Sequence, residues 1–478
     1  MFSRFQSNSS DQVFNLLVVA LLALALFYSG DIPWINDEPL LLQRAFQANQ
    51  AGQLAVEGLT GTSGLPYGPV PTWYYQASLF LRHESINLVT LAFKKQGECI
   101  LVTILGLAGV LKLLKFRKLS FLLVLLSPYL YLYQRMLWDN PFIVPLSAIF
   151  AYFFLAMLER PKPLVGLALC LFASLLVQVH LMALMMLIPA FFILLINTRK
   201  FLVKNLHWCL LGAVIFFVTS GPYLLLLWEK IGASAHTASN YRLSLQSLML
   251  FKLYSFVEFA DYFFPALIES SAPWGQTLMK VLVLFSGLSA FMLIGGICIA
   301  LYPKTQKELS SLQKQMALWS GLTLMLHCLF HLWRGQDFHP HYLLATWLAS
   351  LFFIALFLER FRTRKSIQLL TSTYFFSCGI LLLTFVYKVH YFGGNRSLHF
   401  GPTLGNQLEV VREYQRYPAE TKVIPLIKNY QLFPHAFHAL YSLNSPWARA
   451  PKQAPDVPLQ IVYTEPANKF SGKIALKE

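Results

Sequence analysis

Long apolar runs separated by short polar loops recur along most of the chain, and they constrain its fold more than any other feature. Hydrophobic residues make up 56% of the 478 residues and charged residues only 13%. A helix that crosses a bilayer needs about 20 mainly apolar residues, so the pattern predicts an all-α polytopic membrane protein. About eleven candidate spans lie at 13–28, 97–114, 119–134, 141–158, 163–179, 182–196, 206–228, 276–302, 316–333, 341–358 and 366–388.

Basic residues collect in alternate short loops, and this predicts an orientation. Such loops stay on the cytoplasmic side of a membrane. They lie at 112–118, 160–162, 199–204, 304–314 and 360–365. We therefore predict a multi-pass inner (plasma) membrane protein with a cytoplasmic N-terminus, and with loops 31–96 and 229–275 and the tail from 390 outside. The basic residues in these loops account for the net charge of +16. Because they are scattered between apolar segments, as membrane topology requires, we expect no nucleic-acid partner.

One stretch, 247–268, does not fit this topology easily. It is apolar enough to span a membrane, yet it carries Lys252, Glu258 and Asp261. A span here would invert every later loop and place the basic run 360–365 outside. We interpret the stretch as a helix that lies in the membrane interface, and the sequence leaves open whether it spans.

The composition changes to that of a soluble segment near residue 393. A helical pattern at 404–417, strand-like runs at 423–427 and 459–465, and a helix at 433–443 predict a small extracytoplasmic α/β domain. We divide the chain into a transmembrane domain, 1–392, and this C-terminal domain, 393–478. All six cysteines lie in or beside apolar runs, so we expect neither a disulfide framework nor a thiolate metal site.

Two acidic residues, Asp37 and Glu38, open a helical pattern just where the chain leaves the membrane. As a purely structural feature, they would cap that helix and complement its dipole. A cap needs one oxygen, however, whereas this position offers two carboxylates. Our functional interpretation is that Asp37 is a general base, which takes a proton from an acceptor hydroxyl at the membrane face.

A second polar group lies at the predicted outer end of two spans. It contains Arg135 and Asp139, four residues apart, followed by Asn140 and Pro141. The two charged side chains could pair with each other. Alternatively, Asp139 is a second acid of the active site and Arg135 binds phosphate.

The densest polar cluster between two spans is 333–342, also predicted to lie outside. Its basic groups, Arg334, His339 and His341, would neutralise an anionic leaving group, or they lie in a solvated loop. A divalent metal is possible, but no third ligand stands at a fitting spacing, so we assign no cofactor and no metal. His180, at an outer turn, is either bonded to a neighbouring helix or part of a substrate cavity.

These motifs in this order resemble the GT-C fold polyprenol-phosphate-sugar glycosyltransferases, the superfamily of protein O-mannosyltransferases and aminoarabinose transferases. The resemblance covers about residues 13–390 and adds two matches to those above. An aromatic, proline-containing second helix stands in LPYGPVPTWYYQ, and HPHYLL matches a basic residue followed by Tyr-Leu-Leu. Two positions depart from the pattern: Gly68 stands where members often carry lysine, and Ala345 where they carry proline.

The resemblance implies a catalytic base at Asp37, with Glu38 and Asp139 beside it, and a cavity that admits the lipid-linked sugar. Because Gly68 offers no cation, the donor phosphate would be bound by residues from other loops. These are Arg135, Arg334, His339 and His341. The cavity would be lined by Tyr67, Trp73, Tyr74, His180 and Tyr342.

The expected function is therefore an inverting glycosyltransferase. It would move a sugar from a polyprenyl-phosphate donor to a glycan, lipid or protein acceptor outside the cytoplasm. A polyprenyl phosphate is already a good leaving group, so the reaction needs a base and cationic stabilisation but no nucleotide. Two alternatives stay open: a transporter or lipid flippase, for which inverted repeats and mid-membrane charges would be expected, and a catalytically degenerate scaffold of the same fold.

Overall fold

The structure of the protein is a computed structural model. It describes residues 23, 26–34, 37–61, 64–80, 88–116, 133–234, 273–334, 340–394, 402–417, 421–425, 458–464 and 473–477. Some sequence-predicted segments fall largely or wholly outside these ranges. They are the spans at 13–28 and 119–134, the interfacial helix at 247–268 and the helix at 433–443.

The described residues form a helical bundle of a polytopic membrane protein. Five of its helices are long and apolar enough to cross a membrane: α4 (Leu88–Leu114), η1 with α7 (Asn140–Phe142 and Ile143–Glu159), α11 (Leu206–Ser234), α15 (Pro273–Leu301) and α19 (Lys365–Phe392). The other helices of the bundle are α2 (Asp37–Gln50), α3 (Val70–Phe80), α8 (Pro163–Val179), η2 (Leu181–Ala183), α9 (Leu184–Asn197), α10 (Arg199–Lys204), α16 (Pro303–Glu308), α17 (Ser311–Arg334), η4 (Pro340–Ala345) and α18 (Trp347–Phe361).

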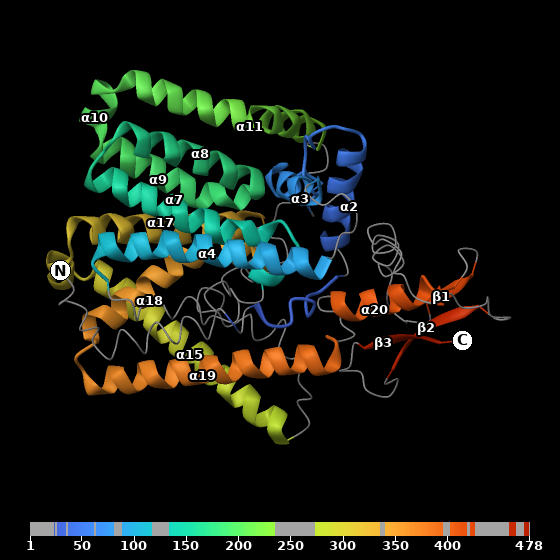
Figure 1. The fold of residues 1–478 in the computed structure, drawn as a ribbon. Coiled ribbons are helices and arrows are strands. Elements are labelled where there is room, and N and C mark those ends of the chain that lie inside the picture. The colour runs from blue at the N-terminus through green and yellow to red at the C-terminus, as the bar shows by residue number, and fades with distance from the viewer. Residues whose placement is uncertain are drawn as a thin grey trace, which may run out of the picture.

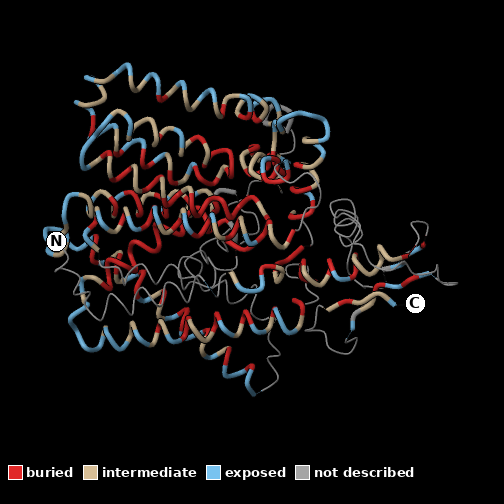
Figure 2. Tube along the Cα trace, viewed as in Figure 1, coloured by how far each residue is buried: buried red, intermediate tan, exposed pale blue. Residues whose placement is uncertain are grey.

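Helices α4, α7, α8, α11 and α19 run in roughly the same direction and α15 crosses them obliquely, while α2 and α3 lie across one end of the bundle (Figure 1). We call this the α2–α3 end. The closest helix pairs are α4 with α7, α7 with α8, α8 with α11 and α15 with α18. Helix α18 is buried on all sides from Trp347 to Leu358, as expected of an apolar helix at a bundle centre. Buried residues concentrate along these inner helices (Figure 2).

Two glycines explain how closely the inner helices approach one another. A Cβ added at Gly106 of α4 would stand 2.7 Å from the carbonyl carbon of Ala148 in α7. A Cβ at Gly296 of α15 would meet the main chain of Phe353 in α18. Small residues at such contacts let helix backbones pack directly in a membrane protein.

Two boundaries differ from the sequence predictions for a physical reason. Helix α4 begins at Leu88 rather than near 97, because its first turns contain lysines and a glutamine that interrupt the apolar run but are still helical. The predicted span 341–358 is not one helix. It divides into η4, which ends at Ala345, and α18, for which Thr346 is the N-cap.

The C-terminal region packs at the α2–α3 end. Helix α19 ends at Phe392, where Gly393 adopts the left-handed conformation (φ 66°). Helix α20 (Leu404–Tyr414) follows, and then a three-stranded sheet. In this sheet β1 (Val423–Pro425) is parallel to β2 (Leu459–Tyr463), which is antiparallel to β3 (Ile474–Lys477).

Helix α20 holds the segment that leads into α2. The main-chain N–H groups of Leu404 and Gly405 donate to the carbonyls of Ile32 and Gly30, at 2.8 and 2.9 Å. The buried Gln407 side chain donates to the Trp34 carbonyl at 2.7 Å. The start of α2, where the predicted base lies, is therefore anchored from the C-terminal region. All six cysteines of the chain are free thiols.

Candidate active site

Two clusters of polar side chains lie at the α2–α3 end of the bundle. The first, which we call the acid cluster, consists of the buried Glu38 and Asp139 and the half-buried Asp37. The second, the histidine cluster, consists of the buried residues His180, His327, His331 and Tyr342. Turn η4, which contains Tyr342, contacts both η1 and η2, so the two clusters belong to one end of one bundle.

The acid cluster joins the first turn of α2 to the loop that precedes η1. Asp37 is the first residue of α2 and Glu38, the second, is 6% exposed. The helix N-terminus favours negative charge at both positions. The Trp138 side chain lies close enough to the Asp37 carboxyl group to influence its ionisation, and Asp139, which is 1% exposed, interacts electrostatically with Asp37 and Glu38. The structure thus brings together all three acids that the sequence singled out.

The surroundings of Asp37 and Asp139 give the two carboxyl groups different proton affinities. Burial raises the pKa of Asp37 above its ordinary value, and the nearby Trp138 side chain opposes the rise. Burial raises the pKa of Asp139 well above its ordinary value, and the Asp37 charge adds to the rise. Asp37 therefore ionises at a lower pH than Asp139, the kind of separation that divides acid and base roles between two carboxyl groups.

Of the two carboxyl oxygens of Asp139, only one is hydrogen-bonded among the described residues. Its Oδ1 accepts from the Asn140 main-chain N–H at 2.6 Å and caps η1. Its Oδ2 is buried and has no hydrogen-bond partner among the described residues, and the same holds for both polar atoms of the Asn140 side chain. Unsatisfied buried polar atoms are costly, so their concentration at one point favours a ligand site there.

Lys95, on α4, is a charged residue of this site that the sequence analysis missed. It is 0% exposed, and its Nζ donates to the main-chain carbonyls of Gln134 and Met136 at 3.1 and 2.6 Å. It also interacts electrostatically with Asp139. The sequence signal was weak, because Gln96, Gly97 and Glu98 separate Lys95 from the apolar run that follows. A lysine buried within a membrane helix nevertheless needs a partner.

Arg135 binds main chain in this structure. Its guanidinium, 2% exposed, donates to the carbonyls of Phe27, at 3.0 Å, and Tyr28. It also attracts the carboxylate of Asp31. These contacts tie the loop before η1 to the segment before α2. The donor-phosphate role expected for Arg135 stays a prediction.

The histidine cluster is built from aromatic rings in contact. The rings of His327 and His331 have centroids 4.6 Å apart, and those of His331 and Tyr342 lie 5.5 Å apart and stack. His180 lies 6.0 Å from Tyr342 and 4.6 Å from Tyr67. Three predicted cavity residues, Tyr67, His180 and Tyr342, are therefore neighbours. The sequence analysis missed His327 and His331, although their spacing of four places them on one face of α17.

The two other predicted cavity residues, Trp73 and Tyr74, form hydrogen bonds with groups outside the histidine cluster. The Trp73 indole donates to the Ala55 carbonyl at 2.7 Å, and the Tyr74 hydroxyl donates to Glu98 at 2.6 Å. Both contacts fix α3 against its neighbours.

The cluster at 333–342 is described only in part. Arg334 ends α17 and His341 lies in η4, but their side chains and the whole of His339 are outside the described residues, so their phosphate-binding roles stay predictions. Among the described residues, no group of three His, Cys, Asp or Glu side chains is arranged to hold a metal ion.

Gly68 shows why this chain has no lysine before the first proline of the second juxtamembrane helix. A Cβ at Gly68 would lie 2.5 Å from both the Cα and the carbonyl oxygen of Gln178 in α8. Such a contact is below any normal van der Waals distance. The cation that stabilises a leaving phosphate would have to come from another position.

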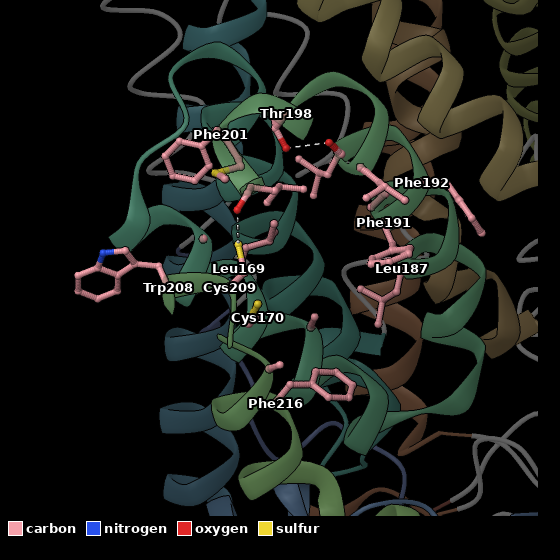
Figure 3. Close-up of a pocket in the computed structure, with 18 of the residues that line it drawn as sticks. Leu169, Cys170, Leu187, Phe191, Phe192, Thr198, Phe201, Trp208, Cys209 and Phe216 are labelled. Atoms are coloured by element: carbon pink, nitrogen blue, oxygen red, sulfur yellow. Dashed lines mark hydrogen bonds between the residues drawn. The ribbon is translucent and has the colours of Figure 1, made fainter. Parts of the chain in front are cut away.

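An apolar cavity of about 670 Å³ lies among α7, α8, α9, α10 and α11 (Figure 3). Its lining includes Leu169, Phe191 and Phe216, with no charged side chain among the described lining residues. Along α8 its lining runs from Pro163 to Val177, three residues before His180. A cavity of this composition suits a hydrocarbon chain and excludes ions.

Comparisons with known proteins identify the fold. No family model matches the chain, and neither does any curated protein. Two crystal structures of ArnT from Cupriavidus metallidurans do match in structure, each at 11% sequence identity. The apo form gives a TM-score of 0.54 over 96% of this chain and 94% of ArnT, and the form bound to undecaprenyl phosphate gives 0.52 over 98% of both. This likeness and the apolar helical bundle confirm the prediction of a polytopic membrane protein with a GT-C-like fold.

Proposed function

We propose that the protein is an inverting glycosyltransferase that takes a sugar from a polyprenyl-phosphate donor. The acceptor is a glycan, a glycolipid or a protein outside the cytoplasm. The observation that carries the proposal is the pair Asp37 and Asp139, two carboxyl groups of different proton affinity at one end of a GT-C-like bundle. The lipid class is supported by ArnT of the same fold, which has been crystallised with undecaprenyl phosphate.

Asp37 takes the proton of the acceptor hydroxyl as that oxygen attacks the anomeric carbon of the sugar. The bond from the sugar to the phosphate breaks, and the polyprenyl phosphate leaves with its electron pair. A single displacement inverts the anomeric centre. General-base catalysis of this type contributes typically about 10²- to 10⁴-fold. Asp139, which keeps its proton longer, donates a hydrogen bond to the reacting groups, and Glu38 adds negative charge that keeps the acceptor proton on Asp37.

The lipid part of the donor would occupy the apolar cavity along α8, whose lining ends at Val177, three residues before His180. Tyr67, His180 and Tyr342 would shape the sugar site next to it. The donor phosphate would be held by Arg135, Arg334, His339 and His341. In a plasma-membrane protein whose N-terminus is cytoplasmic, this end of the bundle faces outside.

The experiment is a transfer assay with purified protein in lipid nanodiscs. Donors are synthetic polyprenyl-phosphate hexoses and pentoses, and acceptors are extracted cell-envelope glycans and glycolipids. Wild type is compared with Asp37→Asn, Glu38→Gln and Asp139→Asn. The control is Glu409→Gln, on the exposed face of α20. We expect transfer to fall by about 10³-fold in Asp37→Asn and to be unchanged in the control.

Full activity of Asp37→Asn with a normal melting temperature would overturn the mechanism. A wild type that transfers no sugar from any donor while binding undecaprenyl phosphate would favour the degenerate scaffold. The close approach of Gly68 to Gln178, which excludes the usual lysine, is the observation that keeps this second function under test.

A further inference from the structure

We propose that Lys95 is the positioning residue of the acid cluster: its ammonium group anchors the loop that carries Asp139 and balances the negative charge of the buried carboxylates. This inference rests on the proposed function and names an internal cation on which that site depends. It concerns a residue of α4 that no motif of the sequence singled out.

The first support is the hydrogen bonding of the Lys95 ammonium. It donates to the carbonyls of Gln134 and Met136, which flank Arg135 in the loop before η1. An ammonium group can donate three hydrogen bonds, and hydrogen bonds from a charged donor are roughly twice as strong as neutral ones. The loop is thus fixed three residues before Asp139, and the position of the Asp139 carboxyl follows from that anchor.

The second support is the contrast between Lys95 and its neighbour Lys94. The Lys94 side chain is 38% exposed and reaches Glu98 and Ser78 at the surface of the bundle, at 3.6 and 3.3 Å. A lysine near a helix end normally extends toward water in this way. Lys95 is 0% exposed instead, and burying an ammonium group is unfavourable unless its charge is compensated. The compensation has to come from the groups around it.

The third support is the set of titratable groups in this region. Cys99, one turn along α4, and Asp139 interact with Lys95. Asp139 in turn interacts with Asp37, Glu38 and Tyr75. Lys95 thus faces Asp139 directly, and Asp139 connects it to Glu38 and Asp37. A buried cation next to a carboxyl group favours its ionised form, so the loss of Lys95 would raise the pKa of Asp139.

The first test measures thermal unfolding of the full chain in nanodiscs and needs no sugar transfer. It compares Lys95→Met, Asp139→Asn, the double variant and the matched control Lys94→Met. We expect a lower melting temperature for Lys95→Met than for Lys94→Met. The double variant should melt at a higher temperature than Lys95→Met alone, because it also lacks the Asp139 carboxyl group that has lost its counter-charge. Additive effects of the two substitutions would contradict the charge-balancing role.

The pH dependence of melting adds a second readout. In Lys95→Met the carboxyl groups bind protons more tightly when folded than when unfolded, so stability rises as pH falls through their folded pKa values. From about pH 8 to about pH 5, the melting temperature of Lys95→Met should rise relative to wild type. If Lys95→Met cannot be purified, recovery of folded protein in the double variant or in Lys95→Arg supports the proposal, and loss of both overturns it.

The second test uses sugar transfer. Removing the opposite charge that faces Asp139 raises the pKa of that carboxyl group, by about one unit or more for a close pair. Because Asp139 acts in its protonated form, the alkaline limb of the transfer profile should move to higher pH in Lys95→Met, and Lys95→Arg should restore its position. A role limited to folding would lower the rate equally at every pH. If wild type transfers no sugar, the proposed function fails while the melting comparison still decides the role of Lys95.

Discussion

The acid cluster and the histidine cluster occupy the same end of the bundle, are both largely buried, and are built in opposite ways. The acid cluster combines negative charges with the Lys95 cation and takes its geometry from a loop bound through main-chain carbonyls. The histidine cluster consists of rings in contact, and its Tyr342 carbonyl lies 3.2 Å from Nε2 of His327. Buried charge needs a compensating charge, whereas neutral rings need only packing and a few hydrogen bonds.

This difference assigns different work to the two clusters. His180 accepts a hydrogen bond at Nδ1 from the Met182 main-chain N–H, at 3.1 Å, which places the proton of the neutral ring on Nε2. It can therefore orient a polar ligand but is not set up to remove a proton through Nδ1. In the proposed mechanism, proton transfer belongs to the acid cluster and shaping of the sugar site belongs to the histidine cluster.

Apart from loss of the Asp37 carboxylate, loss of the Asp139 carboxyl group is expected to reduce sugar transfer more than any other single substitution in the two clusters. Asp139→Asn keeps the shape of the side chain but removes the carboxyl group, so we expect transfer to fall by about 10²-fold. The measurement is turnover at saturating donor. A loss of less than about twofold, with the protein folded, would remove Asp139 from the proposed chemistry.

The pH dependence of transfer should follow the acid cluster. Asp37 acts as a base only when ionised, and burial raises its pKa above the ordinary value of 3.8. Transfer should therefore fall by about tenfold per pH unit below that raised pKa. Turnover measured across the acidic range checks this, and an acidic limb that is unchanged in Asp37→Glu would assign the titration to another group.

Gly68→Ala tests whether the histidine cluster depends on packing. The added methyl group would stand 2.5 Å from Gln178 in α8, and overpacking of this kind costs about 1–3 kcal/mol. We expect a lower melting temperature and weaker donor binding. Gly52→Ala, where nothing lies within 4 Å of the added atom, gives the comparison for a glycine with open space, although its φ of 64° adds strain of its own. Equal melting temperatures of Gly68→Ala and wild type would show that α8 shifts to accommodate the added methyl group.

The smallest effect is expected for His331→Phe. Its ring stacks on Tyr342, and phenylalanine can keep that contact, so turnover should stay within about threefold of wild type and KM should carry the change. A loss as large as that of Asp139→Asn would contradict the division of work between the clusters.

The sequence predicted what depends on local pattern. Apolar runs predicted α7, α8 and α19, the order of motifs predicted the GT-C fold that the ArnT structures confirm, and the acidic pair predicted the start of α2. Lys95 was missed because polar neighbours interrupt its apolar run, although the helix continues through them. The contacts of Arg135 depend on carbonyls more than a hundred residues earlier in the chain, and no local pattern specifies such a partner. The roles of the site residues stay predictions.

The most direct test of the central claim is single-turnover transfer by wild type and Asp37→Asn with one radiolabelled polyprenyl-phosphate sugar. Binding of undecaprenyl phosphate is measured on the same samples. The base role of Asp37 predicts equal lipid binding, a transfer rate about 10³-fold lower in Asp37→Asn, and a product of inverted anomeric configuration in wild type. Transfer by Asp37→Asn at the wild-type rate, or retention of the donor's configuration, would contradict it.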